Sequence, residues 1–275
     1  MTQSGFGANL ARRVATAVVA LPLLLAAFFM GAPALAAGIV AVAVVIGLWE
    51  FFGLMKARGL APFPVPGAVL LGAIFLEVAY PVVPVSLWPA VGLVILASLL
   101  PRGTDFAVTV PSAALTLLGA VYLGALGGSV AALRLLEPDT DGAWRLVLLL
   151  AIVMGSDTAA FFVGSAVGRH KLAPGISPGK TIEGAAGALL GGVAAAAIVR
   201  WLGLPSLPLA HALALGLAVS ALGSAGDLVE SLLKRWAGVK DSGTLFPGHG
   251  GMLDRLDSIL FGAPVLYYYF ALVNT

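Results

Sequence analysis

Long stretches without a charged side chain are the feature that most limits what this chain can fold into. An ionised side chain at the centre of a bilayer costs about 2.5 to 3.5 kcal/mol, and a helix needs about 20 apolar residues to cross. Nine apolar stretches with at most one charged residue each approach that length, near residues 14–33, 35–55, 66–82, 85–101, 111–133, 146–166, 184–203, 207–226 and 256–273. The sequence therefore predicts an all-α, polytopic integral membrane protein with about nine transmembrane helices.

The composition excludes an ordinary soluble domain. Only 10% of the 275 residues are charged and 60% are hydrophobic, whereas soluble domains carry about 25% charged residues. In a soluble protein, a net charge of +2 and a pI near 9.0 would hint at nucleic acid. Here the basic residues are better explained by membrane topology. We expect a single membrane domain over residues 1–275, surrounded by lipid, with no nucleic-acid partner.

The distribution of lysine and arginine predicts the orientation. With a cytoplasmic N-terminus, twelve of the fifteen basic residues fall inside and three outside, as the positive-inside rule requires. The three outside are Arg134, Arg145 and Arg200. The predicted location is therefore the cell membrane, with the larger polar loops facing the cytoplasm.

Residues able to carry chemistry are concentrated in the second half. We expect residues 1–145 to be mainly a hydrophobic scaffold and residues 146–275 to be the catalytic half, with cytoplasmic loops at 167–183 and 227–255. The chain has no cysteine and three histidines, so a metal site would depend on carboxylates. That favours a hard ion such as Mg²⁺.

Two glycine pairs have the spacing that lets membrane helices approach closely. They are Gly124 with Gly128, and Gly187 with Gly191. In a chain with 35 glycines, such pairs also arise by chance.

Asp157 is the first candidate site residue. It lies in the middle of an uncharged stretch between Arg145 and Arg169, where a carboxylate must face a partner or a watery cavity. Glu50 and Glu77 also lie in apolar stretches, and we expect both to be structural.

The second candidate is the segment from Ser177 to Gly184, which contains Lys180. It is not a P-loop, because the first glycine of that motif would fall at Pro174 and no strand is predicted before it. A lysine, hydroxyl groups and free N–H groups at the start of a membrane helix still favour an anion. The alternative is a lipid-facing loop anchored by the lysine.

Two acidic pairs form the third candidate. Asp227 and Glu230 are three residues apart, as are Asp254 and Asp257, so each pair shares one helical face. Like charges on one face call for a compensating cation, and Mg²⁺ that also binds substrate phosphates fits. Nearby basic residues would attract a polyanion, namely Lys234, Arg235, Lys240 and Arg255. The alternative is a solvated, ion-paired loop.

The glycine-rich segment between the acidic pairs is conformationally permissive, so its backbone can approach phosphate closely. It reads Pro247-Gly248-His249-Gly250-Gly251. His249 would donate to a substrate oxygen.

These motifs together resemble the signature of the CDP-diacylglycerol synthases, also called phosphatidate cytidylyltransferases. The matching positions are Ser231, Lys234, Arg235, Lys240, Asp241, Pro247 to Gly251, Asp254, Arg255 and Asp257. Ser156-Asp157 and the segment from Ser177 to Gly184 resemble further motifs of that family. The resemblance covers about a quarter of the chain.

The resemblance implies that CTP and phosphatidate react to CDP-diacylglycerol and pyrophosphate. It implies Mg²⁺ as cofactor, with Mg²⁺ or K⁺ as a second cation, and a homodimer. We expect catalytic roles for Asp227, Asp254, Lys240, Asp241 and Arg255. We expect substrate binding by Ser177, Lys180, Lys234, Arg235, His249, Gly250 and Asp157. We expect metal binding by Asp227, Asp254, Asp257 and Glu230.

Two other functions stay open. One is a CTP-dependent transferase that acts on another lipid phosphate. The other, from a different class, is a transporter for an anionic solute, which would also place Asp157 at mid-membrane. The clustering of polar residues in one-sided loops favours the enzyme.

Overall fold

A computed structural model describes residues 22–80, 88–98, 105–136, 140–245 and 250–273. Residues 22–30 are helical. The further helices are α2 (Pro33–Ala57), α3 (Pro64–Ala79), α4 (Trp88–Ala97), α5 (Phe106–Leu135), α6 (Thr140–Val167), α7 (Ile182–Gly203), α8 (Leu209–Ala237) and α9 (Leu253–Val273). The predicted all-α, polytopic fold is confirmed. Lipid offers no hydrogen-bond partners, so each spanning segment satisfies its own backbone as a helix.

The described residues test part of the predicted number of spans. Within the described residues, six helices are long and apolar enough to cross a membrane, namely α2 and α5 to α9. Helices α3 and α4 have 16 and 10 residues and coincide with the third and fourth predicted spans. The first predicted span, 14–33, is described only from residue 22 on. The count of nine therefore stays a prediction.

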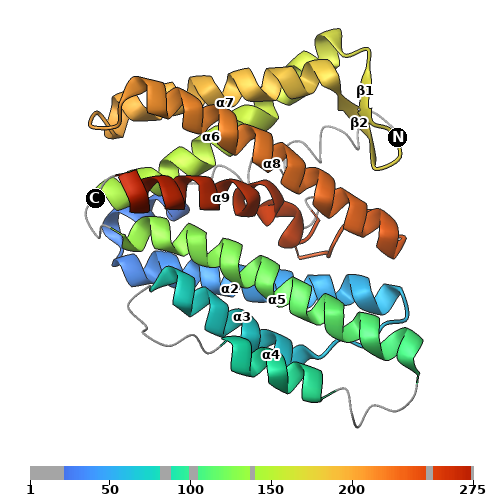
Figure 1. The fold of residues 1–275 in the computed structure, drawn as a ribbon. Coiled ribbons are helices and arrows are strands. Elements are labelled where there is room, and N and C mark those ends of the chain that lie inside the picture. The colour runs from blue at the N-terminus through green and yellow to red at the C-terminus, as the bar shows by residue number, and fades with distance from the viewer. Residues whose placement is uncertain (1–21, 81–87, 99–104, 137–139, 246–249, 274–275) are drawn as a thin grey trace.

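The helices form two groups joined by α9 (Figure 1). Helices α6, α7 and α8 pack together, and α2, α3 and α4 pack with α5. Helix α9 lies between them and contacts both α8 and α5. The polar start of α9 therefore lies next to elements from both halves of the chain.

Both glycine pairs noted in the sequence are close packing points. A Cβ atom at Gly124 or Gly128 would collide with α3, and one at Gly187 or Gly191 would collide with α6. At Gly191 the atoms in the way are the Cβ of Ala159 and the carbonyl oxygen of Gly155. The two faces carrying these glycines thus fix α5 against α3 and α7 against α6.

A small hairpin interrupts the helical pattern where we expected a loop. Strands β1 (Lys171–Ala173) and β2 (Ser177–Thr181) pair in antiparallel fashion, with Lys171 opposite Thr181 and Ala173 opposite Ser177. Helix α7 starts directly after β2, where the Thr181 hydroxyl accepts a hydrogen bond from the Gly184 N–H at 3.1 Å. Lys180 therefore lies within a strand, which also differs from the loop position of a P-loop lysine.

The polar connections gather at one end of the bundle. The hairpin, the α2–α3 connection and the region between α8 and α9 lie on the right in Figure 1, whereas the α7–α8 connection lies on the left. This matches the predicted grouping of the cytoplasmic loops on one side. The orientation of the bundle in a membrane, and the division into scaffold and catalytic half, stay predictions.

Candidate active site

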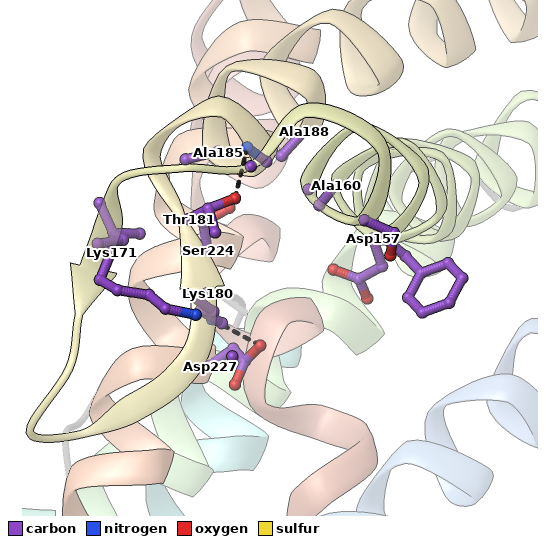
Figure 2. A pocket seen from close by; sticks show the side chains of 16 residues that line it. Asp157, Ala160, Lys171, Lys180, Thr181, Ala185, Ala188, Ser224 and Asp227 are labelled. Carbon is purple, nitrogen blue, oxygen red and sulfur yellow. Dashed lines mark hydrogen bonds and ion pairs between the residues drawn. The ribbon is translucent and has the colours of Figure 1, made fainter.

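A cavity of about 590 Å³ lies where α6, the hairpin and α8 meet. Its polar lining comes from three of the predicted segments, with Asp157 from α6, Lys180 from β2 and Asp227 from α8. Figure 2 shows Asp157 on α6 and Lys180 on β2, whose side chains both line this cavity. Sites for small molecules typically have volumes of about 300 to 1,000 Å³, so this cavity is large enough for a ligand.

Two contacts hold the hairpin against α8. The Lys180 ammonium nitrogen lies 2.7 Å from a carboxylate oxygen of Asp227 (Figure 2). Closer to the end of α8, Arg235 Nε donates to the carbonyl oxygen of Ile176 at 3.2 Å. Arg235, predicted to bind substrate, thus contacts the hairpin backbone. Ser177 lies between these two contacts, partly buried in β2.

Glu183 fixes the other end of the hairpin and was not singled out from the sequence. Its carboxylate accepts hydrogen bonds from the N–H groups of Arg169 and His170 at 3.0 and 3.2 Å. It also contacts His170 Nδ1 at 2.6 Å. Because Glu183 is in the first turn of α7, it ties the segment before β1 to the helix after β2.

The structure brings Asp257 of the second acidic pair close to the carboxylates of the cavity. The Asp257 carboxylate lies close enough to those of Asp227 and Asp157 to be repelled by both. Asp157 is also attracted by Lys180 and Arg255. Four predicted residues, from β2, α8 and α9, therefore share one electrostatic environment with Asp157.

A second, more buried group of charged side chains is centred on Lys234. Lys234 forms ion pairs with Glu230 and Asp254, each at 2.5 Å. The second oxygen of Asp254 accepts hydrogen bonds from the N–H groups of Ser242 and Gly251, at 3.0 and 2.7 Å, and from the Ser242 hydroxyl at 2.8 Å. Asp254 is thus held far more tightly than Asp227.

Glu50 joins this group from the N-terminal half. Its carboxylate accepts hydrogen bonds from the Ser242 hydroxyl at 3.0 Å and from the N–H groups of Met252 and Leu253 at 2.9 and 2.8 Å. Sequence reasoning treated Glu50 as structural. Helical periodicity relates neighbours along one helix, and it gives no signal for contacts about 200 positions away.

The remaining predicted residues lie near the loop between α8 and α9. Lys240 and Asp241 are exposed in this loop, and Arg255 is exposed in the first turn of α9. His249 lies outside the described residues. Gly250 has a φ of +78°, and an added Cβ would contact Asp254. A side chain at position 250 would therefore disturb the backbone that presents Asp254.

The donor set suits a divalent cation that also binds a ligand. Within the parts of the chain that the structure describes, no three acidic or histidine side chains converge closely enough to hold a metal ion alone. Mg²⁺ needs only one or two carboxylates when substrate phosphates and waters complete its shell. Asp227 and Asp254 each bind a lysine ammonium, which shows that both carboxylates accept a cation.

The numbers of acidic and basic side chains in this region also favour a cation. Five acidic side chains interact in this region, from Asp157, Asp227, Glu230, Asp254 and Asp257. The cations that interact with them are Lys180, Lys234 and Arg255. Acidic side chains therefore outnumber basic ones in this region, which makes it rich in the oxygen ligands that a hard cation prefers.

Comparisons with known proteins match a family over nearly the whole chain. The model of the cytidylyltransferase family matches residues 11–273. A phosphatidate cytidylyltransferase from Synechocystis is 33% identical over 95% of this chain and 97% of its own length. Nearly the whole chain is therefore similar to that protein.

Two further relatives match over a shorter region. A phosphatidate cytidylyltransferase from Bacillus subtilis is 41% identical over 57% of this chain and 58% of its own length. The uncharacterized protein YnbB from Escherichia coli is 44% identical over 51% of this chain and 48% of its own length. The matched region thus spans only about half of each of these two relatives.

Proposed function

Because the chain belongs to the cytidylyltransferase family, we propose that it is a phosphatidate cytidylyltransferase, an enzyme of phospholipid biosynthesis. It would convert CTP and phosphatidate to CDP-diacylglycerol and pyrophosphate. The observation that carries the proposal is the cavity in which Lys180 and Asp227 meet beside Asp157. It gives a bundle of apolar helices a polar site for phosphate groups.

The reaction needs no general base. A phosphate monoester such as phosphatidate already carries an anionic oxygen. That oxygen forms a bond to the α-phosphorus of CTP, while the bond from this phosphorus to the oxygen bridging to the β-phosphorus breaks. Pyrophosphate leaves with the bonding electrons. The protein's task is therefore to position the two anions and stabilise charge on the transferring group.

The basic residues around the cavity would bind the phosphates. Lys180 lies at the cavity wall, so it would contact a phosphate oxygen when Asp227 releases it. Lys240 and Arg255 are exposed on the adjoining loop and helix start, where they and His249 would hold the triphosphate. Lys234 stays between Glu230 and Asp254, which suits a role in orienting these carboxylates.

Asp227 and Asp254 would be the main protein ligands of Mg²⁺, with Asp257 and Glu230 beside them. When bound, Mg²⁺ would neutralise charge on the phosphates during transfer. The gathering of carboxylates described above supports this assignment. A second cation, Mg²⁺ or K⁺, would fit the same carboxylate-rich region.

The site would face the cytoplasm. It lies at the end of the bundle where the predicted cytoplasmic loops gather (Figure 1), and CTP is a water-soluble substrate. Phosphatidate would reach it from the surrounding lipid of the cell membrane. A homodimer remains part of the proposal and is tested by the size of the purified particle.

Transfer of label tests the function. The purified protein in detergent is given CTP labelled in its α-phosphate, phosphatidate and Mg²⁺. The expected result is label in a lipid product that needs both Mg²⁺ and phosphatidate. Label passing only to a different lipid phosphate would move the assignment to another CTP-dependent transferase. Solute uptake into proteoliposomes without any covalent product would replace it by a transporter.

A further inference from the structure

Glu50 is a buried carboxylate whose position no helix-packing requirement explains. It lies in α2 with 9% of its surface exposed. Its partners are the Ser242 hydroxyl and the N–H groups of Met252 and Leu253. A carboxylate removed from water is costly unless hydrogen bonds compensate, and here three donors do so.

The two N–H groups belong to the start of α9. The first N–H groups of a helix have no partner inside it, and the positive end of the helix dipole favours a negative charge there. Helix α9 begins at Leu253 and carries Asp254 in its first turn. Glu50 thus fixes the point at which the helix bearing Asp254 and Asp257 begins.

Ser242 connects Glu50 to Asp254. Its hydroxyl lies 3.0 Å from a Glu50 oxygen and 2.8 Å from an Asp254 oxygen. A hydroxyl has one proton to donate, so the two carboxylates share a single donor. A chain of contacts therefore runs from Glu50 through Ser242 and Asp254 to Lys234.

The glycines around Glu50 are required by this arrangement. An added Cβ at Gly243 or Gly251 would collide with the Glu50 carboxylate. The N–H of Gly251 also donates to Asp254 at 2.7 Å. At these two positions the loop lies too close to Glu50 to carry a side chain.

From these contacts we infer that Glu50 is a positioning residue for the nucleotidyl transfer. It would hold the loop after α8 and the start of α9 in the geometry that places Asp254 and Asp257. The inference rests on the proposed function. It assigns to the N-terminal half a direct part in shaping the site.

The test replaces Glu50 with glutamine in the full-length protein and measures kcat and the KM for CTP at fixed Mg²⁺. Glutamine has the same size, but one carboxylate oxygen is replaced by an NH₂ group. This group can only donate, and it would face the N–H and hydroxyl donors that bind Glu50. The expected result is a fall in kcat of about 10- to 100-fold, the scale of a small misplacement of catalytic groups. Glu77→Gln is the matched control, since it makes the same change on α3, and it should keep the wild-type kcat.

A second variant separates positioning from folding. Ser242→Ala removes the shared hydroxyl and leaves both backbone donors to Glu50 in place. It should lower kcat as well, and in the Glu50→Gln background it should add less than it does alone, because both changes break one chain of contacts. Should Glu50→Gln fail to fold, Ser242→Ala alone decides: a lowered kcat supports the inference, and the wild-type value overturns it.

The outcomes distinguish this inference from the proposed function. A wild-type protein that transfers no label from CTP to phosphatidate defeats the function itself. An active wild type, with folded Glu50→Gln and Ser242→Ala variants that both keep the wild-type kcat, defeats the positioning role alone. Independent, multiplicative losses in the double variant would also defeat it.

Discussion

Lys180 and Asp227 join the β-hairpin to α8 through a 2.7 Å contact between the ammonium and a carboxylate oxygen. The two residues are 47 positions apart and belong to separate motifs. Their side chains are 25% and 35% exposed, so both reach the cavity and remain open to a ligand. The contact places side by side a lysine that we propose binds phosphate and an aspartate that we propose binds Mg²⁺.

Lys180→Met should therefore impair the enzyme much more than the fold. A partly exposed ion pair contributes about 1 kcal/mol or less to stability, whereas loss of a donor to transferring charge lowers kcat by about 10²- to 10³-fold. Turnover and thermal unfolding in detergent measure the two effects. Lys56→Gln, which removes a charge from the end of α2, is the control. An active Lys180→Met variant would remove Lys180 from the site.

Asp227→Asn should weaken the response to Mg²⁺. The amide keeps the shape of the side chain but loses the negative charge that holds the cation, so activity at fixed Mg²⁺ should fall at least about tenfold. A titration of activity against Mg²⁺ measures the change. Asp105→Asn is the control, because Asp105 caps α5 and asparagine caps a helix equally well. An unchanged Mg²⁺ curve for Asp227→Asn would contradict the metal assignment.

Glu183→Ala should loosen the hairpin while leaving the helices intact. The N–H groups of Arg169 and His170 lose their acceptor, so their hydrogen exchange should speed up. The KM for CTP should rise because Lys180 is less well placed. His170→Ala is the comparison: it removes only the imidazole contact, and exchange at the Arg169 N–H should then stay slow. Equal exchange in both variants would show that Glu183 does not anchor the hairpin.

Gly250→Ala should reduce both stability and activity. An alanine at a φ of +78° carries strain of about 1 to 3 kcal/mol, and its Cβ would press on Asp254. Thermal unfolding and turnover report the two losses. Gly175→Ala is the control, because a Cβ there meets nothing within 4 Å. A Gly250→Ala variant as stable and active as wild type would show that the loop has another conformation.

Hydropathy was sufficient to predict most of the helices, because a long uncharged stretch in lipid has few alternatives to a helix. Helices α5 to α9 follow the predicted stretches closely, extended by up to eleven residues where polar turns continue them. The hairpin was missed because β2 contains Pro178 and Gly179, residues that are depleted in strands. Its pairing depends on anchors at Glu183 and Arg235, which lie outside both strands.

The candidate site was predictable only in part. Motif spacing selected Asp157, Lys180, Asp227 and Asp257, which the structure brings together. It also predicted that each acidic pair would need positive charge, and Lys180 and Lys234 supply some of it. The two members of an acidic pair do not share one environment, however. Asp227 faces the cavity, whereas Glu230 is buried against Lys234, because residues three apart on a helix still differ in direction by part of a turn.

The three donors that Glu50 receives also constrain the order in which the protein is assembled. Helix α2 leaves the ribosome long before Ser242, Met252 and Leu253 have been made, so the newly inserted Glu50 carboxylate has to keep water as its partner. Arrival of the last helix replaces that water with fixed N–H and hydroxyl groups. A chain that ends before α9 would therefore hold Glu50 without these donors. Glu50 gains its final partners only when the last helix has been made.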